Sequence, residues 1–225
     1  MPASEVHNTD CLEYMRTLPD KAFELAIADP PYGIGAASMT MGSGKNRQWT
    51  KKDWDTEIPM DEFFAELMRV CAEQIIWGGN YFPLPLNGNW IVWDKKNPNL
   101  SFAEGELAWC SIKRNLRIFQ FYTGNVDNGG RIHPTQKPVA LYAWLLKNYA
   151  KPGDRIFDSM MGSQSSRIAA YKMGFDYVGC ELDKEYFAKG CERFDRECRG
   201  LYKSDNGQTY QQTSIFDPQN SESIL

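Results

Sequence analysis

Short apolar runs alternate with amphipathic segments along most of the chain. The runs are apolar almost to both ends, which is typical of strands buried on both faces of a parallel sheet. They cover residues 24–29, 74–78, 90–94, 155–158 and 177–181. Hydrophobic positions at helical spacing predict helices over residues 61–72, 138–149 and 183–198. Strands that alternate with helices predict an α/β domain with a mostly parallel sheet.

Three parts of the chain depart from this alternation. The runs 107–113 and 117–122 predict an antiparallel pair of strands. Residues 34–56 predict a long loop, because they combine Gly, Ser, Thr and basic residues without a clear period. Residues 204–225 are rich in Ser, Gln, Asn and Asp and contain no Lys or Arg, so we expect a poorly ordered tail. The predicted organisation is one domain over residues 1–203, followed by that tail.

The charge is distributed unevenly. The 225 residues include 25 basic and 29 acidic side chains, and the net charge of −4 argues against indiscriminate nucleic-acid binding. Residues 94–137, however, carry seven basic side chains against four acidic ones. Residues 45–52 carry four basic side chains and no acid, namely Lys45, Arg47, Lys51 and Lys52. These two segments are the predicted contacts to a polyanion.

The remaining composition indicates the compartment. No run approaches the roughly 18 apolar residues that a membrane span needs. The first residues lack the pattern of a signal peptide. The six cysteines form no C-x-x-C pair, which favours reduced thiols in the cytoplasm. We therefore expect a cytoplasmic protein with no membrane partner and no metal site.

The tetrapeptide Asp29-Pro30-Pro31-Tyr32 directly follows a predicted strand. Ligands of an open α/β sheet bind beyond the carboxyl ends of the strands. Two prolines stiffen the turn and remove two N–H donors, so the turn offers one carboxylate, carbonyl acceptors and an aromatic ring. Such a turn is suited to an amino group on a flat ring, which the tyrosine would stack on. On its own it is nearly as often an ordinary loop.

A second small-residue turn, over 158–166, also follows a predicted strand and leads into a helix. Such turns allow a ligand to approach the backbone N–H groups. Glu181 comes about twenty residues later at the end of the next strand, where an acid commonly binds a ribose diol. The turn lacks the lysine of a phosphate-binding loop and the G-x-G-x-x-G of a dinucleotide site. Its spacing indicates a nucleoside pocket, although a plain strand–turn–helix is equally common.

The segment 133–138, His-Pro-Thr-Gln-Lys-Pro, precedes the predicted helix 138–149. Proline at a first helical position is a helix-start signal, and taken alone the segment is a helix cap. Thr135 and Lys137 at the same helix N-terminus are suited to a carboxylate.

Taken together and in this order, segments 25–33, 133–138, 157–163 and 179–183 closely resemble the β-class S-adenosylmethionine-dependent DNA amino-methyltransferases, which modify adenine N6 or cytosine N4. The resemblance extends to about residue 194. It implies a Rossmann-like, mostly parallel seven-stranded sheet, circularly permuted so that the catalytic motif precedes the cofactor motif. It also implies a target-recognition insert over about 94–131, double-stranded DNA as partner, a possible homodimer, and a bacterial or phage origin.

The resemblance assigns roles to individual residues. The catalytic turn is Asp29, Pro30, Pro31 and Tyr32. The cofactor S-adenosylmethionine would contact Asp10, Cys11, Asp29, His133, Thr135, Lys137, Asp158, Met160, Gly162, Ser163, Glu181 and Leu182. Candidate DNA contacts are Lys45, Arg47, Lys51, Lys52, Asn80, Tyr81, Lys95, Lys96, Lys113 and Arg114. Asn80 and Tyr81 belong to a segment that resembles the frame of a flipped-base pocket and is equally compatible with a buried strand and turn.

The cofactor turn departs from the family pattern Asp-Pro-Phe-x-Gly-Ser-Gly-Thr. Ser159 and Met160 stand for Pro and Phe, and Gln164 and Ser165 stand for Gly and Thr. A lost glycine where backbone meets ligand puts cofactor affinity in question.

Several functions compete with adenine N6 methylation. Cytosine N4 methylation uses the same motifs, whereas C5-cytosine chemistry needs a catalytic cysteine, typically after proline, and no cysteine here follows one. RNA or protein amino-methyltransferases share the fold but more often carry Asn at position 29. A degenerate DNA-binding paralogue is suggested by Gln164. A nicotinamide-dependent oxidoreductase leaves the Asp29–Tyr32 turn unexplained.

Overall fold

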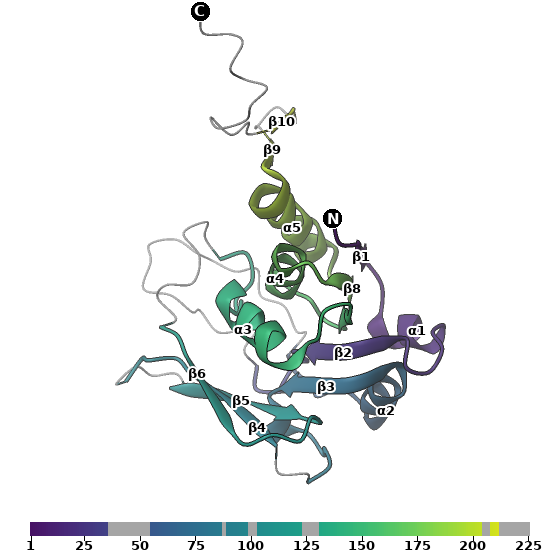
Figure 1. Ribbon diagram of the computed structural model, residues 1–225, viewed down its shortest axis with the longest axis vertical. Coiled ribbons are helices and arrows are strands. Elements are labelled where there is room, and N and C mark those ends of the chain that lie inside the picture. Colours follow the sequence, from purple (N-terminus) through teal and green to yellow (C-terminus); the bar gives the residue numbers. More distant parts are fainter. Residues whose placement is uncertain (36–54, 87–88, 99–102, 123–130, 204–207, 212–225) are drawn as a thin grey trace, which may run out of the picture.

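The computed structural model describes residues 1–35, 55–86, 89–98, 103–122, 131–203 and 208–211. Its centre is a sheet with the strand order β1-β8-β7-β2-β3-β5-β4-β6 (Figure 1). The strands are β1 (Ser4–His7), β2 (Phe23–Ala28), β3 (Cys71–Trp77), β4 (Trp90–Asp94), β5 (Gly105–Cys110), β6 (Arg117–Gln120), β7 (Arg155–Asp158) and β8 (Asp176–Cys180). Only β5 runs against its described neighbours, so the prediction of a mostly parallel sheet is confirmed.

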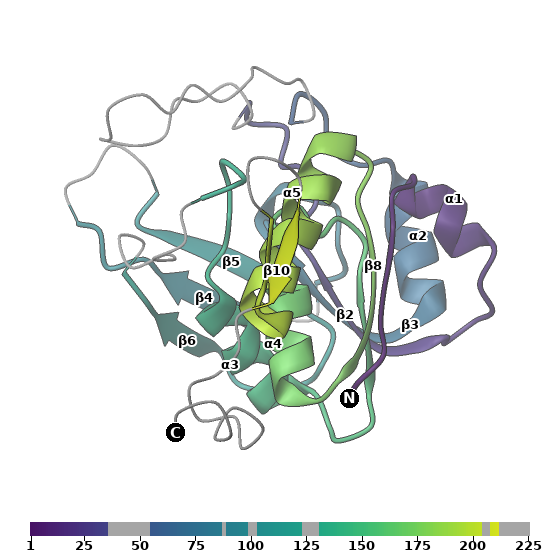
Figure 2. The same cartoon turned by 90° about the horizontal axis from the view of Figure 1, so that it is seen from above.

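Helices cover the two faces of this sheet (Figure 2). They are α1 (Cys11–Arg16), α2 (Asp61–Val70), α3 (Val139–Tyr149), α4 (Ser165–Met173) and α5 (Lys184–Phe194). From Leu25 to Ala28 the side chains of β2 alternate between the faces: Leu25 and Ile27 pack in the core under α3 and α4, whereas Ala26 and Ala28 pack in the core under α1 and α2. This three-layer packing explains why the central strands are apolar without interruption. No helix in the described part of the chain has the length and apolarity to cross a bilayer.

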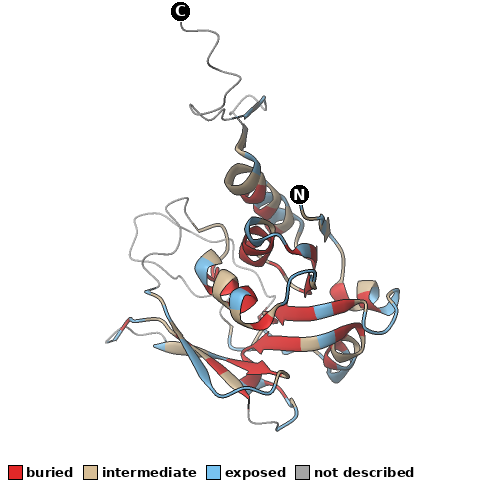
Figure 3. Cartoon of the chain, in the orientation of Figure 1, coloured by how far each residue is buried: buried red, intermediate tan, exposed pale blue. Residues whose placement is uncertain are grey.

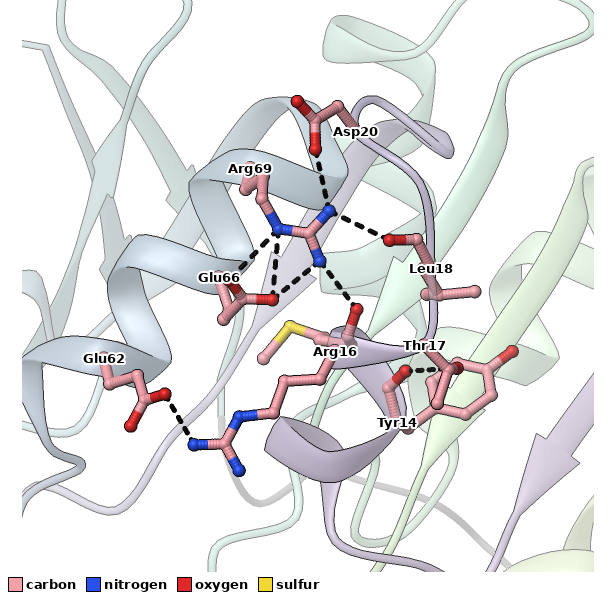
Figure 4. A network of polar contacts seen from close by, with 9 residues as sticks. Tyr14, Arg16, Thr17, Leu18, Asp20, Glu62, Glu66 and Arg69 are labelled. Atoms are coloured by element: carbon pink, nitrogen blue, oxygen red, sulfur yellow. Dashed lines mark hydrogen bonds and ion pairs between the residues drawn. The ribbon is translucent and has the colours of Figure 1, made fainter.

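A partly exposed network of polar contacts attaches α1 to α2 (Figure 4). The Arg69 guanidinium of α2 donates to the main-chain oxygens of Met15 and Leu18, and it also binds the carboxylates of Glu66 and Asp20. One side chain therefore fixes the connection that leads from α1 into β2. That connection sets the position from which β2 carries its last residues to the functional edge of the sheet.

Three sequence-based expectations differ from the structure. The sheet has eight strands where seven were expected, because the unpredicted strand β1 extends one of its edges. The expected antiparallel pair 107–113 and 117–122 is wrong: β4 lies between the two strands, antiparallel to β5 and parallel to β6. The expected poorly ordered tail contains β10 (Thr209–Gln211), which pairs antiparallel with β9 (Leu201–Lys203). The remainder of 204–225, apart from Gln208, lies outside the described residues.

Element boundaries differ in smaller ways. Helix α2 passes directly into β3, because Cys71 already has extended backbone angles. Helix α5 ends at Phe194 and continues as a π-helical turn, Asp195–Arg199. A short 3-10 turn, Gly79–Tyr81, follows β3. The sequence pattern did not predict β1 or α1, because both are too short to show a period.

Candidate active site

A cavity of about 550 Å³ lies beyond the carboxyl ends of β1, β8, β7 and β2. These four strands are parallel neighbours, so the turns that follow them meet at one edge of the sheet. All predicted cofactor residues except Asp158 line this cavity: Asp10, Cys11, Asp29, His133, Thr135, Lys137, Met160, Gly162, Ser163, Glu181 and Leu182. Segments that are far apart in the sequence thus form one pocket.

Asp158 lies beneath the cofactor turn and does not line the cavity. Its side chain is 1% exposed and accepts hydrogen bonds from the Met160 N–H and the Ser166 hydroxyl. Burial raises the pKa of Asp158 to about 7, against the lowering effect of these two hydrogen bonds. The predicted direct cofactor contact is therefore replaced by support of the turn from the protein side.

The atypical Gln164 adopts a left-handed backbone conformation, which glycine favours. Its φ is 60°, in the left-handed region. Gln164 is not among the described residues that line the cavity. Its side chain packs against Gly190 of α5. There it donates to the Phe187 carbonyl oxygen (3.3 Å) and accepts from the Arg167 guanidinium (2.8 Å). The substitution therefore leaves the space for a ligand unobstructed.

Two acidic residues at the cavity are held by backbone amides, all but that of Gly162 close to them in sequence. Glu181 accepts from the N–H of Gly162 (2.9 Å) through one carboxylate oxygen and from the N–H of Asp183 (2.8 Å) through the other. Asp10 accepts from the N–H groups of Leu12 and Glu13 and so caps α1. Both carboxylates thus have fixed positions in the cavity wall.

The remaining wall combines aromatic and sulfur-containing side chains. The His133 ring meets the Tyr186 ring at 4.3 Å between centroids, and the Thr135 hydroxyl lies 3.1 Å from His133 Nδ1. Gly162 has a φ of +46° and faces the same imidazole. Burial raises the pKa of Cys11 to about 12, so this cysteine is a neutral thiol in the wall.

The four residues of the catalytic turn have different surroundings in the structure. Asp29 and Pro31 line the cavity, whereas Pro30 is buried and Tyr32 lies beyond the lining. The Tyr32 hydroxyl donates to Asp29 Oδ1 at 2.8 Å. The Tyr32 ring stacks on the Tyr81 ring, with centroids 5.2 Å apart and planes at 15°. One face of Tyr32 is therefore covered by a second aromatic ring that is itself 45% exposed.

Lys137 binds protein carboxylates at this site. Its ammonium lies 2.6 Å from Asp29 Oδ1 and 3.0 Å from Glu106 Oε2. The predicted role of Lys137 in holding a ligand carboxylate is thus in competition with two ion pairs. Glu106, which sequence reasoning missed, has no motif around it that could have drawn attention to it.

Asp55 is a second residue that sequence reasoning missed. It is 1% exposed, and its Oδ1 accepts from the N–H groups of Tyr32 (2.7 Å) and Gly33 (3.0 Å). Its carbonyl accepts from the N–H of Gly35. Because Pro30 and Pro31 have no N–H, Asp55 binds the first two backbone donors that follow them. Gly78, with a φ of +68°, provides the space for the Tyr32 ring, since a Cβ there would lie 2.2 Å from it.

The candidate DNA residues have different surroundings. Lys95 is 15% exposed and binds Glu106 at 2.6 Å, and Lys96 pairs with Asp94. Asn80 and Tyr81 are exposed beside Tyr32. Arg114 donates to the Asn148 carbonyl at the C-terminal end of α3, the end remote from the cavity, and Lys113 is exposed next to it. Lys45, Arg47, Lys51 and Lys52 lie outside the described residues.

Comparison with known proteins agrees with this geometry. A family model described as DNA methylase matches residues 109–190, which include the 133–138 segment and the cofactor turn. The type II methyltransferase M.HinfI of Haemophilus influenzae is 25% identical over 79% of this chain and 64% of its own length. The type II methyltransferase M2.DpnII of Streptococcus pneumoniae is 23% identical over 84% of this chain and 89% of its own length.

A solved structure shows the same fold. The M1.HpyAVI–SAM complex superposes with a TM-score of 0.59 and 20% identity, covering 85% of this chain and 98% of the other. The sequence matches make the chain similar to DNA methyltransferases, and the likeness to this solved structure concerns the fold. The chain spans 64% of M.HinfI, so its own activity is argued from its site.

Proposed function

We propose that the protein binds S-adenosylmethionine and uses it to methylate the exocyclic amine of a base in double-stranded DNA, with adenine N6 as the first candidate. The observation that carries the proposal is the shared cavity: Asp29 of the catalytic turn lines the same space as Glu181 and the cofactor turn. An acceptor for an amine and a pocket for a nucleoside thus adjoin one another.

The residues present fit S-adenosylmethionine. Glu181 is suited to the ribose hydroxyls, because its two carboxylate oxygens are already fixed by backbone amides and retain further acceptor capacity. Asp10, Cys11 and Leu182 also line the cavity, and the adenine would lie against them. Gln164, which suggested a degenerate cofactor site, points its side chain away from the ligand space. When bound, the cofactor supplies a methyl group on a sulfonium, an electrophile for direct transfer.

This chain's own residues would orient the amine. A base inside a duplex must first be flipped out, at a cost of a few kcal/mol. The Asp29 carboxylate and the Pro30 carbonyl would each accept one N–H of the amine, which directs the nitrogen lone pair towards the cofactor side of the cavity. Tyr32 and Tyr81 would form one stacking platform for the base, since their rings are already stacked. Positioning of this kind provides much of the rate of such a transfer.

The proposal includes a location and a DNA-facing edge. We propose a bacterial cytoplasmic enzyme, in line with the bacterial relatives. In this proposal Asn80 and Tyr81 would contact the flipped base, and Lys96 would contact nearby phosphate. Arg114 lies at the far end of α3 and is not part of this edge.

The test is methylation by purified protein with labelled S-adenosylmethionine. Unmodified genomic DNA is digested to nucleosides after the reaction, and mass spectrometry separates N6-methyladenine from N4-methylcytosine. We expect N6-methyladenine with the wild type and none with Asp29→Ala, which should still bind the cofactor by calorimetry. N4-methylcytosine would replace the adenine assignment, label found only in RNA would shift the substrate class, and no transfer to any nucleic acid would refute the function.

A further inference from the structure

Four charged side chains form a cluster directly behind the catalytic turn. Asp29 is 18% exposed, Lys137 3%, Glu106 20% and Lys95 15%. Two are acidic and two are basic, so their charges compensate. A buried charge without a partner is costly, and each member of such a group therefore depends on the others.

Lys137 is the shared member of the cluster. Its ammonium has three oxygen neighbours: Asp29 Oδ1 at 2.6 Å, Glu106 Oε2 at 3.0 Å and the Tyr32 hydroxyl at 3.2 Å. The Tyr32 hydroxyl in turn contacts Glu106 Oε2 at 3.2 Å as well as Asp29. Glu106 thus approaches both groups that hold the Asp29 carboxylate. On its other side, Glu106 is anchored by Lys95.

We propose that Glu106 is a positioning residue for Asp29: it shares the Lys137 ammonium with Asp29 and thereby leaves that carboxylate only partly neutralised and available to accept an incoming amine. The inference rests on the proposed function for its catalytic meaning. Because Glu106 and Asp29 both pair with the Lys137 ammonium, the negative charge of Asp29 is neutralised only in part.

The pKa shifts of Glu106 and Asp29 agree with a Lys137 ammonium that both carboxylates share. Burial acts to raise the pKa of Glu106, but the ammonium groups of Lys137 and Lys95 outweigh it and hold the value at about 2. Burial raises the pKa of Asp29, the Lys137 ammonium opposes that rise, and the Glu106 carboxylate adds to it. Glu106 is thus the firmly ionised partner. The other titratable groups facing Asp29 are Tyr32 of its own turn, Tyr142 of α3 and Asp158 of β7.

The antiparallel direction of β5 explains how Glu106 reaches this position. Parallel strands bring their last residues to the functional edge, whereas β5 brings its first residues there. Glu106 is the second residue of β5 and pairs with Trp93, next to the end of β4. A carboxylate at the start of a strand is therefore placed beside one at the end of another.

The test measures the Asp29 titration directly, in the absence of DNA and cofactor. Protein labelled with ¹³C-aspartate is titrated by NMR, and the Asp29 carboxyl resonance is assigned by its absence in Asp29→Ala. Glu106→Gln should lower the Asp29 midpoint by about one pH unit, because a like charge is removed. Lys137→Met should raise it, and the double variant should return it towards the wild-type value. The matched control Glu104→Gln, an exposed carboxylate two residues earlier, should leave it unchanged.

The activity profile provides a second readout. In Glu106→Gln the acid limb of the methylation rate should move to lower pH and the plateau should fall, because Lys137 then binds Asp29 alone, while cofactor affinity stays constant. An Asp29 midpoint in Glu106→Gln equal to that in Glu104→Gln would overturn the proposal. If Glu106→Gln does not fold, Lys95→Met replaces it. Without Lys95, Glu106 should pair more strongly with Lys137, which weakens the Lys137–Asp29 ion pair and raises the Asp29 midpoint. An unchanged midpoint in Lys95→Met overturns the proposal. If the Asp29 midpoint shifts in Glu106→Gln as expected but the wild-type protein methylates no nucleic acid, the proposed function is refuted and the charge coupling between Glu106 and Asp29 is retained.

Discussion

The two halves of the sheet hold their functional side chains in different ways. In the cofactor half, which comprises β1, β8, β7 and β2, the last three strands are covered on both faces, and two acidic groups bind backbone amides nearby in sequence: Asp10 that of Leu12, Asp158 that of Met160. In the target half, β3, β5, β4 and β6, the outer strands are partly exposed (Figure 3). There Tyr32 contacts Glu106, 74 residues away, and Lys137, 105 residues away.

This difference shows which parts of the site are held mainly by contacts between residues close in sequence. The cofactor half is built from turns whose geometry short stretches of chain determine. The catalytic turn depends on side chains that only the folded sheet brings to it. Substitutions in the first half should therefore change affinity or stability, whereas those in the second should change the rate.

Among the residues outside the catalytic turn, the largest effect is expected from Asp55→Ala. Two buried N–H groups of the catalytic turn would lose their acceptor, the turn would shift, and the methylation rate should fall by about 100-fold. Cofactor affinity should be unchanged, as measured by calorimetry. Asp55→Asn keeps an oxygen acceptor and should restore most of the rate. Asp154→Ala removes a similar carboxylate–amide contact before β7 and serves as control; an equal rate loss there would remove the distinction between the halves.

Glu181→Ala should act on the other half. Loss of its carboxylate removes a ligand acceptor and frees the Gly162 amide, so S-adenosylmethionine should bind about 10- to 100-fold more weakly. At saturating cofactor the rate should approach that of the wild type. Asp176→Ala, at the other end of β8, is the matched control. Unchanged affinity in Glu181→Ala would contradict the assigned role.

Asp158 gives a prediction for pH. Its folded-state pKa, about 7, lies above the ordinary value of 3.8. The folded state therefore binds this proton more tightly than the unfolded state, and the associated stability is complete below about pH 4 and lost as the pH rises through 7. Asp158→Asn should not show this loss of stability. Its free energy of unfolding at pH 8 should therefore exceed that of the wild type by on the order of 2 kcal/mol. Urea melts from pH 5 to 8 measure this, with Asp61→Asn on the exposed start of α2 as control.

The smallest effect is expected at Gln164. Gln164→Ala keeps the left-handed backbone but leaves the buried Arg167 guanidinium without one acceptor, so the free energy of unfolding should fall by about 1–2 kcal/mol. Gln164→Gly should lose less, because glycine adopts that backbone without strain worth about 1 kcal/mol. Gly190→Ala should be tolerated only together with Gln164→Gly, since its Cβ would lie 2.6 Å from the Gln164 amide. Additive effects of the two changes in urea melts would contradict this packing.

Much of the molecule was predictable because it depends on local pattern. The apolar runs predicted β2, β3, β4, β7 and β8, and helical spacing predicted α2, α3 and α5, each within a few residues. The pairing of β5 and β6 was not predictable, since two neighbouring strands in sequence leave open whether a third lies between them. The sequence named most of the residues that line the cavity, several of them because they follow a recognisable strand, and their roles stay a prediction.

The sequence by itself determined the parallel sheet, the catalytic turn after β2 and the acidic wall of the cofactor cavity, because strand ends, prolines and backbone turns act over a few residues. Only the tertiary structure decided that Asp55 and Glu106 support the catalytic turn, that Lys137 binds Asp29, and that Gln164 points towards α5. Those contacts depend on strand order, on the reversed direction of β5 and on burial. Each of these is a property of the packed chain, and no short segment of the sequence contains it.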